Sequence, residues 1–362
     1  MIVSHKMITE TEFMRFQVTE SISADISRFE SVVTSSETIE DAVLETSAVK
    51  FVPRIRSGSY ADIGRRRSME DEHIRVDDLS GHLSSLLKCA MPSAFYAVFD
   101  GHNGPDAATF IKRNAIRLFF EDAELPQIAD IDAAFLKELE SSHKKAFLLA
   151  DDALAAESSV SDSCGTTVLT ALVLGRHLMV ANAGDCRAVL CRKGSAVDMT
   201  QDHKPTYSPE RRRVEELGGT IDYGYLNGYL SVTRALGDWE LKLPLGKESP
   251  LIADPDVNQV MLTEDDEFLI IGCDGIWDVI SSQSAVSLVR RGLRRHDDPQ
   301  ECARELVMEA YRLHSTDNLT AIVICFSSSS RTESCPPQRQ RFRCWNPSDG
   351  DRSRLNSLLE GN

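Results

Sequence analysis

Four short acidic stretches of the chain carry side chains that could do chemistry together. They are Met69-Glu70-Asp71, Asp100-Gly101-His102, Asp274-Gly275 and Asp317-Asn318. Asp100 and Asp274 end apolar runs typical of buried strands, AFYAVF and FLIIGC, and Asp317 precedes a third such run, LTAIVICF. A carboxylate at a strand end is exposed enough to bind a ligand and is anchored by the buried strand. Such oxygen-rich positions suit hard cations such as Mg²⁺ and Mn²⁺.

Three or four of these strand ends, brought together, would make a two-metal site. Metals about 3.5–4 Å apart can hold a water as hydroxide and clamp a phosphoryl group, and they would relieve repulsion among the carboxylates. Gly101 has no Cβ, so its carbonyl oxygen could approach a metal closely. His102 could give a proton to a leaving oxygen. An arginine of the run Arg65–Arg67 could grip a phosphate with its forked donors.

Each motif also has an ordinary structural interpretation. A single Asp-Gly after a strand is most often a turn, and a run of arginines is most often a solvated surface segment. A single histidine such as His102 is more often a surface or core residue than a catalytic one. The occurrence of all these motifs together, at strand ends and in this order, favours a metal-dependent hydrolase.

The segments that would position these groups alternate between strand and helix patterns. An early strand, Phe95–Phe99, precedes helical patterns over Gly104–Phe120 and Asp132–Glu157. Three β-like runs follow, TTVLTALVLG, HLMVANAG and RAVLCRKG, and their glycine-containing turns predict an antiparallel meander. The later predicted elements are a short helix from Ser208 to Leu217, a strand Glu267–Cys273, helices Ser282–Leu293 and Pro299–His314, and a final strand Leu319–Phe326. This order predicts an α+β layered fold rather than a doubly wound one.

Composition limits the class of protein. The chain has 362 residues, 42% hydrophobic, and a formal net charge of −16, which argues against nucleic acid or an anionic membrane as the main partner. The nine cysteines form no CxxC pair, so structural zinc is not expected. No run of about 18 apolar residues is present, and the start lacks the apolar segment of a signal peptide. We therefore expect a protein of the cytoplasm and/or nucleus.

Three regions are predicted from composition. Residues 1–50 are rich in Ser, Thr and Glu and lack sustained periodicity, so we expect a disordered tail. Residues 51–326 hold all the strand and helix signals and should form one large domain. Residues 327–362, which begin SSSSRTESCPPQRQRFR, are expected to be a second disordered tail.

The motifs, taken as an ordered set, resemble those of a known family. DGHNG, SDSCGTT, ANAGDCRAVL, TQDHKP, NGYLSVTRALGD, CDGIWDV and STDNLTAIVICF resemble the metal-dependent protein serine/threonine phosphatases of type 2C. The resemblance covers about residues 57–326, and the block GRRRSMED resembles the plant branch. It implies a four-layer α-β-β-α sandwich with two central antiparallel sheets flanked by helix pairs. It also implies hydrolysis of phosphoserine and phosphothreonine esters by a water that bridges two divalent metals.

The resemblance assigns the metal ligands residue by residue. Asp100 would bridge two Mg²⁺ or Mn²⁺ ions, and the carbonyl of Gly101 would bind the first. Asp274 and Asp317 would hold the second ion, with Glu70 binding it directly or through water. Asp162 matches the family position for a weaker third metal, and Asp71 and Asp278 match supporting positions around the ligands.

The resemblance also assigns the groups that act on the substrate. His102 would be the general acid. Arg66, four residues before Glu70, would bind the phosphate, with Arg65 as the alternative. We interpreted the remaining polar residues of two motifs as structural: Arg234 and Asp238 in VTRALGD, and His203 and Lys204 in TQDHKP.

One departure from the family bears on partners. The co-receptor phosphatases that bind abscisic acid receptors carry a tryptophan in the flap, whereas this chain has Tyr223 in GGTIDYGYLNGYL. We therefore expect no such receptor partner. The expected partners are phosphorylated proteins, with no nucleic acid or membrane, and the chain is expected to be a monomer.

Two other functions were considered. A catalytically dead pseudophosphatase is disfavoured because no expected ligand is missing. A different two-metal hydrolase, such as a phosphodiesterase, typically needs a histidine-rich ligand set. Only His102 of the nine histidines lies in a suitable motif.

Overall fold

The computed structural model describes residues 51–79, 81, 92–123, 131–242 and 249–328. The predicted N-terminal tail and nearly all of the predicted C-terminal tail lie outside these residues. The last strand continues to Ser328, slightly past the predicted domain end at 326. None of the helices in the described ranges is both long enough and apolar enough to cross a membrane.

Two large antiparallel sheets form the centre of the described part of the chain. One has the strand order β1-β15-β14-β8-β9, with the bounds Pro53–Asp62, Leu319–Ser328, Asp266–Gly272, Arg187–Arg192 and Ser195–Asp198. The other has the order β13-β7-β6-β3-β2, with the bounds Asp256–Met261, His177–Ala183, Val168–Leu174, Ser93–Phe99 and Glu72–Val76. Strands β3 and β6 are buried over all their residues, as expected for strands covered on both faces.

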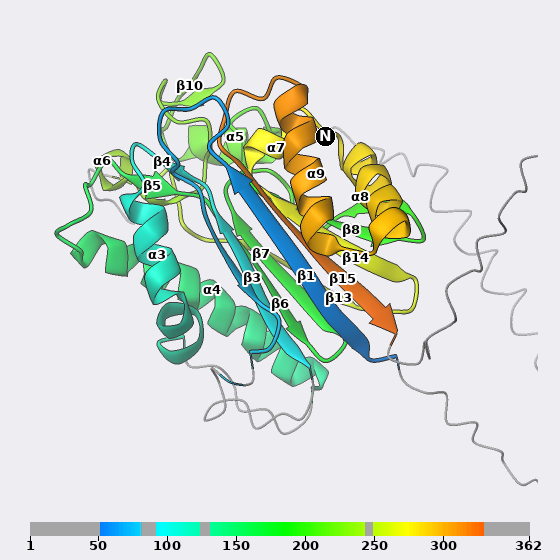
Figure 1. Ribbon diagram of the computed structural model, residues 1–362. Helices are drawn as coiled ribbons and strands as arrows, with labels where there is room; N and C mark the ends of the chain where they lie inside the picture. Colours follow the sequence, from blue (N-terminus) through cyan, green and yellow to red (C-terminus); the bar gives the residue numbers. More distant parts are fainter. Residues whose placement is uncertain (1–50, 80, 82–91, 124–130, 243–248, 329–362) are drawn as a thin grey trace, which may run out of the picture. The chain divides into compact units, whose positions relative to one another are not determined.

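Helix pairs cover the outer faces of both sheets, as Figure 1 shows. On one side lie α3 (Asp106–Ile116) and α4 (Ala133–Ala156), and on the other lie α8 (Ser282–His296) and α9 (Pro299–Arg312). Alternate residues of β3 serve two cores. Tyr96 belongs to the core shared with the first sheet and α8–α9, whereas Phe95 and Phe99 pack against α3 and α4. The α-β-β-α sandwich expected from the family resemblance is therefore confirmed.

Most predicted helices and strands are present with small shifts at their ends. Asp132 caps α4 by accepting a hydrogen bond from the backbone N–H of Phe135. The first predicted helix divides into α3 and a π-helical turn, η2 (Arg117–Glu121). Smaller helices are α5 (Ser208–Glu216), α6 (Trp239–Lys242) and α7 (Asp274–Trp277).

The predicted three-stranded meander is wrong at its last step. β6 and β7 pair, but β8 pairs with β14 and β9 in the other sheet. The chain changes sheets at Gly184, whose φ of 128° favours glycine. An apolar run that is buried on both faces does not reveal which sheet it joins, so the pattern could not show this change.

A small third sheet carries residues of the candidate site. Its strands, in the order β12-β5-β4, are Leu236–Gly237, Gly165–Thr166 and Gly101–His102. Gly165 is paired with His102 on one side and with Gly237 on the other. Three segments far apart in the sequence thus meet at one edge of the sandwich. The flap segment GGTIDYGYLNGYL contains a two-stranded hairpin formed by β10 (Ile221–Asp222) and β11 (Tyr225–Leu226).

Candidate active site

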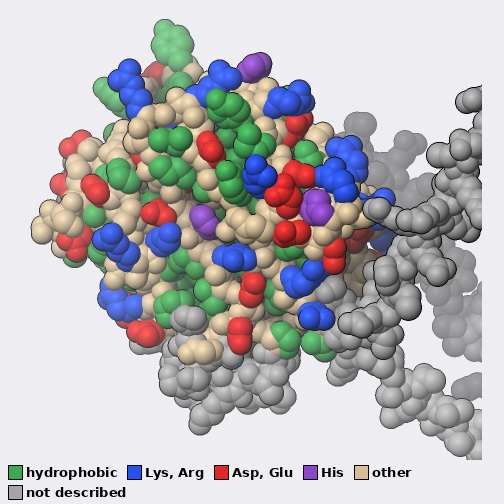
Figure 2. All heavy atoms as spheres, in the orientation of Figure 1, with side chains coloured by type: hydrophobic (Ala, Val, Ile, Leu, Met, Phe, Trp, Pro, Cys, Tyr) green, Lys and Arg blue, Asp and Glu red, His purple; other side chains and the backbone are tan. Residues whose placement is uncertain are grey.

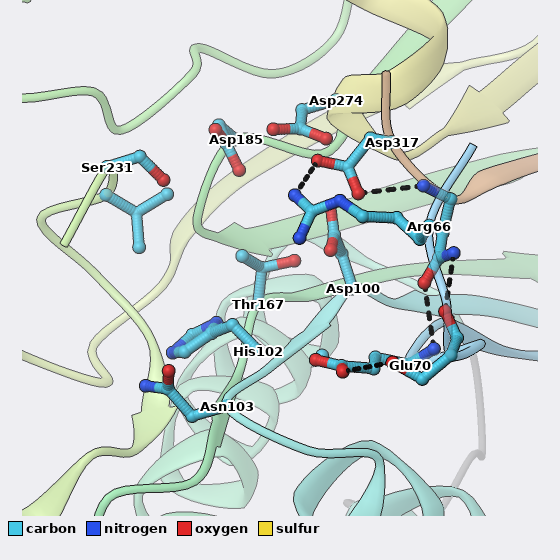
Figure 3. Close-up of a pocket in the computed structure, with 14 residues that line it drawn as sticks. Arg66, Glu70, Asp100, His102, Asn103, Thr167, Asp185, Ser231, Asp274 and Asp317 are labelled. Atoms are coloured by element: carbon cyan, nitrogen blue, oxygen red, sulfur yellow. Dashed lines mark hydrogen bonds and ion pairs between the residues drawn. The ribbon is translucent and has the colours of Figure 1, made fainter. Parts of the chain in front are cut away.

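Strand ends and loops of both sheets surround a cavity of about 170 Å³ (Figure 3). The sequence-predicted residues that line it are Arg66, Glu70, Asp100, Gly101, His102, Asp274 and Asp317. Asp100 lies directly after β3, Asp274 lies after β14 at the start of α7, and Asp317 lies just before β15. The three carboxylates predicted to lie at strand ends, Asp100, Asp274 and Asp317, therefore do meet in one cavity.

Three carboxylates gather in the cavity, of which Asp185 is buried and Asp100 and Asp274 are half-buried. One oxygen from each of Asp100, Asp185 and Asp274 lies within 4.8 Å of the others. Burial raises the pKa of Asp100 well above its usual range, and the charge of Asp274 raises it further. Burial likewise raises the pKa of Asp274, with Asp185 and Asp317 adding to the effect. The pKa of Asp185 rises to about 6, chiefly through burial. These carboxylates cannot all ionise at neutral pH without a compensating cation.

Two cationic side chains, Arg66 and Lys204, contact carboxylates at or beside the cavity. Arg66 Nη2 lies 2.6 Å from Asp317 Oδ2, and Lys204 Nζ lies 2.6 Å from Asp278 Oδ1 and 3.6 Å from Asp185 Oδ2. The ion pairs seen in the described ranges leave Asp100 and Asp274 without a protein cation. An all-oxygen set of mutually repelling carboxylates fits hard divalent ions such as Mg²⁺ or Mn²⁺.

A hydrogen-bonded clamp fixes the position of Glu70. Its backbone N–H donates to Asn318 Oδ1 at 2.8 Å, and Asn318 Nδ2 donates to the carbonyl oxygens of Ile63 and Ser68. The carboxylate of Glu70 accepts from Ser68 Oγ at 2.7 Å and from the Gly104 N–H at 3.2 Å. The loop before β2 is therefore tied to the start of β15, beside Asp317.

Glycine at position 101 has a packing reason in this fold. A Cβ on Gly101 would clash with the carbonyl oxygen of Glu70 and press on the side chain of Ala108. Any larger residue would push the Glu70 loop away from the strand end that carries Asp100. The absence of a side chain therefore keeps two of the predicted metal ligands together, beyond leaving the Gly101 carbonyl accessible.

Behind the cavity, His102 contacts a carboxylate that the sequence analysis treated as structural. His102 Nε2 lies 2.7 Å from Asp238 Oδ2, and the Asp238 side chain is only 1% exposed. The contact passes over Gly165, where a Cβ would clash with both Asp238 Oδ2 and His102 Nε2. Asp238 has a left-handed backbone with φ of 53°. Such a conformation is uncommon for aspartate and persists only where the surroundings hold it.

A buried ion pair holds the loop that carries Asp238. Lys242 Nζ lies 2.7 Å from both carboxylate oxygens of Asp151 in α4 and donates to the Ala235 carbonyl at 3.0 Å. Asp151 also accepts from the Gly237 N–H at 2.8 Å. The side chains of Lys242 and Asp151 are 5% and 10% exposed. The ion pair thus fixes the segment before and after Asp238 against the long helix.

Arg65 and Arg66 point to different surroundings. Arg66 lines the cavity (Figure 3). The guanidinium of Arg65 instead lies 5.5 Å from the centre of the Tyr311 ring and 3.0 Å from His314 Nδ1. Of the two alternatives left open by the sequence, only Arg66 can reach a ligand in the cavity without moving.

Asp162 is the one predicted metal residue that the structure does not bring to the cavity. It is exposed in the turn before β5, and its carbonyl oxygen accepts from the Glu240 N–H at 3.2 Å. Of the predicted supporting residues, Asp71 is buried and accepts from Thr320 Oγ1 at 2.7 Å. Burial raises the pKa of Asp71 to about 6. Asp278 is exposed and paired with Lys204.

Two contributors to the site, Asp185 and Lys204, were not predicted from the sequence. Asp185 ends the strand run HLMVANA as Asp100 and Asp274 end theirs, so the rule of carboxylates at strand ends could have found it. Lys204 pairs with carboxylates at the cavity, whereas we had assigned it to a structural turn. The structural assignment does hold for its neighbour His203, which is fully buried and bonded to the Gly184 N–H and to Asp256.

Comparison with known proteins identifies relatives along most of the chain. The sequence profile of a family described as "Protein phosphatase 2C" matches residues 56–319. The chain is 60% identical over 353 residues to "Probable protein phosphatase 2C 13" of Arabidopsis thaliana, covering 95% of this chain and 90% of that protein. It is 64% identical over 299 residues to "Probable protein phosphatase 2C 2" of Oryza sativa subsp. japonica, covering 81% and 79%.

Solved structures share the fold at low sequence identity. A serine-threonine phosphatase 2C from Toxoplasma gondii has a TM-score of 0.63 and 23% identity, covering 76% of this chain and 98% of that one. A C. elegans sex determining protein also has a TM-score of 0.63, with 20% identity, covering 87% and 71%. These likenesses concern the fold alone.

Proposed function

The chain belongs to the protein phosphatase 2C family as a metal-dependent serine/threonine protein phosphatase of the plant branch, and on this basis we propose how its cavity works. Phosphoserine and phosphothreonine esters are hydrolysed at the carboxylate cluster. The supporting observation is that no ion pair among the described residues joins Asp100 or Asp274 to a cationic side chain, although burial raises the pKa of both carboxyl groups.

The proposed metal ligands are those that line the cavity: Glu70, Asp100, Gly101 through its carbonyl, Asp274 and Asp317. Two Mg²⁺ or Mn²⁺ ions, if held there, would supply an activated water for attack on phosphorus and would neutralise the phosphoryl oxygens. We add Asp185 to this set because its oxygen lies in the same cluster as Asp100 and Asp274. A weaker third ion at Asp162 stays a separate prediction.

The remaining steps belong to side chains of the protein. His102 gives a proton to the departing serine or threonine oxygen, which is a poor leaving group without one. Asp238 holds the imidazole through Nε2, which leaves Nδ1 to serve the substrate. Orientation of a catalytic histidine by a buried carboxylate is an established arrangement in other hydrolases.

Substrate phosphate is proposed to bind Arg66. Its guanidinium neutralises Asp317 in this structure. If Asp317 held a divalent ion, the forked donors of Arg66 would be available to bind a phosphate. The substrates are phosphorylated proteins, and we retain the expectations of a monomer in the cytoplasm and/or nucleus. Tyr223 is fully exposed on the β10–β11 hairpin and has no indole N–H, so we propose that abscisic acid receptors are not partners.

Replacing Arg66 with alanine should lower kcat/KM for a phosphothreonine peptide by about 10- to 100-fold. Charge-assisted hydrogen bonds contribute about 1.5–3 kcal/mol, and 1.4 kcal/mol is about tenfold in rate. Arg65→Ala is the matched control, with an expected change under about threefold because Arg65 lies outside the cavity. Steady-state kinetics on both variants shows which of the two arginines binds the substrate phosphate. A larger loss for Arg65→Ala would transfer the phosphate-binding role to that residue.

Metal dependence tests the proposed function directly. Phosphate release from a phosphothreonine peptide should require added Mn²⁺ or Mg²⁺, and EDTA should abolish it because the proposed attacking water is activated by the metal ions. The control is the same peptide without enzyme at each metal concentration. A folded protein that releases no phosphate with either metal would contradict the proposal and favour the pseudophosphatase.

A further inference from the structure

Ser68 lines the cavity but has no part in the proposed hydrolysis. It is exposed in the segment between β1 and β2. Its hydroxyl donates to Glu70 Oε1 at 2.7 Å, and its carbonyl accepts from Asn318 Nδ2 at 3.0 Å. The loop is therefore anchored next to the proposed metal ligands, while the hydroxyl remains reachable from solvent.

Three exposed arginines directly precede this serine: Arg65, Arg66 and Arg67. Arg67 forms no ion pair with any residue in the described ranges, and Arg65 contacts the side chains of Tyr311 and His314 rather than a carboxylate. A run of exposed positive charge beside a hydroxyl is a pattern that the acidic surface of another enzyme can read.

We propose that Ser68 is the acceptor for a protein kinase that selects arginines before its target serine, and that the added phosphate closes the cavity to substrate. Ser68 Oγ attacks the γ-phosphorus of the nucleoside triphosphate that the kinase binds. A phosphate ester bond forms, the bond to the nucleoside diphosphate breaks, and the hydroxyl proton passes to the kinase. The closure of the cavity rests on the proposed function of Arg66 and Glu70, whereas the modification itself does not.

Charge explains why the phosphate would close the cavity. A phosphoserine carries about −1.5 to −2 charges at pH 7 and three strong acceptor oxygens. It would replace a hydroxyl that now donates to Glu70, so a hydrogen bond becomes a like-charge repulsion. Arg66 and Arg67 directly precede it in the sequence, and a guanidinium engaged by phosphoserine cannot hold the phosphate of a substrate.

The chain provides its own matched control for the modification. Arg54-Ile55-Arg56-Ser57 also has arginine three residues before a serine. Ser57 lies in β1, is 8% exposed, and its hydroxyl donates to Asp77. Sequence alone makes the two serines similar targets, whereas the fold leaves only Ser68 accessible.

The first experiment treats the full-length Asp100→Asn protein, which cannot remove its own phosphate, with ATP and a kinase that selects arginine three residues before serine, a feature that Ser68 and Ser57 share. Peptide mass spectrometry should find phosphate on Ser68 and none on Ser57. Heat-unfolded protein treated in the same way should be modified at both serines. Native protein that stays unmodified at Ser68, whatever happens elsewhere in the chain, would overturn the proposal.

The second experiment separates charge from size on the active enzyme. Both Ser68→Glu and Ser68→Gln remove the hydroxyl that donates to Glu70, so only the added charge distinguishes them. Ser68→Glu should have a kcat/KM for the phosphothreonine peptide about tenfold or more below that of the isosteric Ser68→Gln. Equal values for the two variants would refute closure by charge. An inactive wild type would instead count against the proposed function, and the mapping on Asp100→Asn would still decide whether Ser68 is modified.

Discussion

Asp100→Asn should abolish phosphate release from a phosphothreonine peptide, with a loss in kcat of at least about a thousandfold. The substitution keeps the size of the side chain but removes the charge that both metals are proposed to share. Transition-state stabilisation by a metal is worth several kcal/mol, and about 4 kcal/mol corresponds to a thousandfold. Single-turnover kinetics at saturating Mn²⁺ measures the loss.

Stability measurements should separate this loss from unfolding. Burial raises the pKa of Asp100, so its ionised form destabilises the fold at any pH above the unfolded-state pKa. In EDTA at pH 7, Asp100→Asn should therefore be at least as stable as the wild type. Saturating Mn²⁺ should stabilise the wild type, by about 2.7 kcal/mol at a hundred times the Kd, and should stabilise the variant much less.

The control for Asp100→Asn is Asp265→Asn. The side chain of Asp265 is 46% exposed, is paired with Lys193, and lies outside the cavity. This variant should keep the activity and the Mn²⁺-induced stabilisation of the wild type. Activity retained in Asp100→Asn would exclude Asp100 as the shared ligand and shift attention to Asp185 and Asp274.

The carboxylates Asp100 and Asp274 of the cavity were predictable because each follows from a local pattern. Apolar runs specify buried strands, and a carboxylate that directly follows such a run can only lie at the rim of the sheet. This reasoning applies to Asp100 and Asp274 and would have applied to Asp185. It does not extend to Asp162, which follows no apolar strand and lies in an exposed turn.

Interactions between distant segments could not be predicted in the same way. The transfer of β8 to the other sheet depends on the left-handed turn at Gly184, which an apolar pattern does not record. The contact between His102 and Asp238 joins residues 136 positions apart. It exists because Gly165 leaves space for it and because Lys242 pairs with Asp151 behind the loop. From the sequence, His102 was assigned as a general acid and Asp238 as a structural residue, and nothing local linked the two.

Asp238→Asn should impair hydrolysis according to the leaving group. With a phosphothreonine peptide, kcat should fall by about 10- to 100-fold, part of the 10²–10⁴ that general acid catalysis contributes. With an aryl phosphate such as p-nitrophenyl phosphate, the leaving oxygen needs little protonation, so kcat should fall by less than about threefold. His102→Gln should show the same selectivity with a larger loss on the peptide.

The selectivity between substrates distinguishes a positioning role from a purely structural one. If Asp238 only supported the loop, its replacement would move the metal ligands and harm both substrates alike. Glu240→Gln, an exposed change two residues along the same loop, controls for substitution at that place and should leave both rates unchanged. An equal loss of kcat on the two substrates would contradict the positioning role, because only proton donation depends on how badly the leaving oxygen needs a proton.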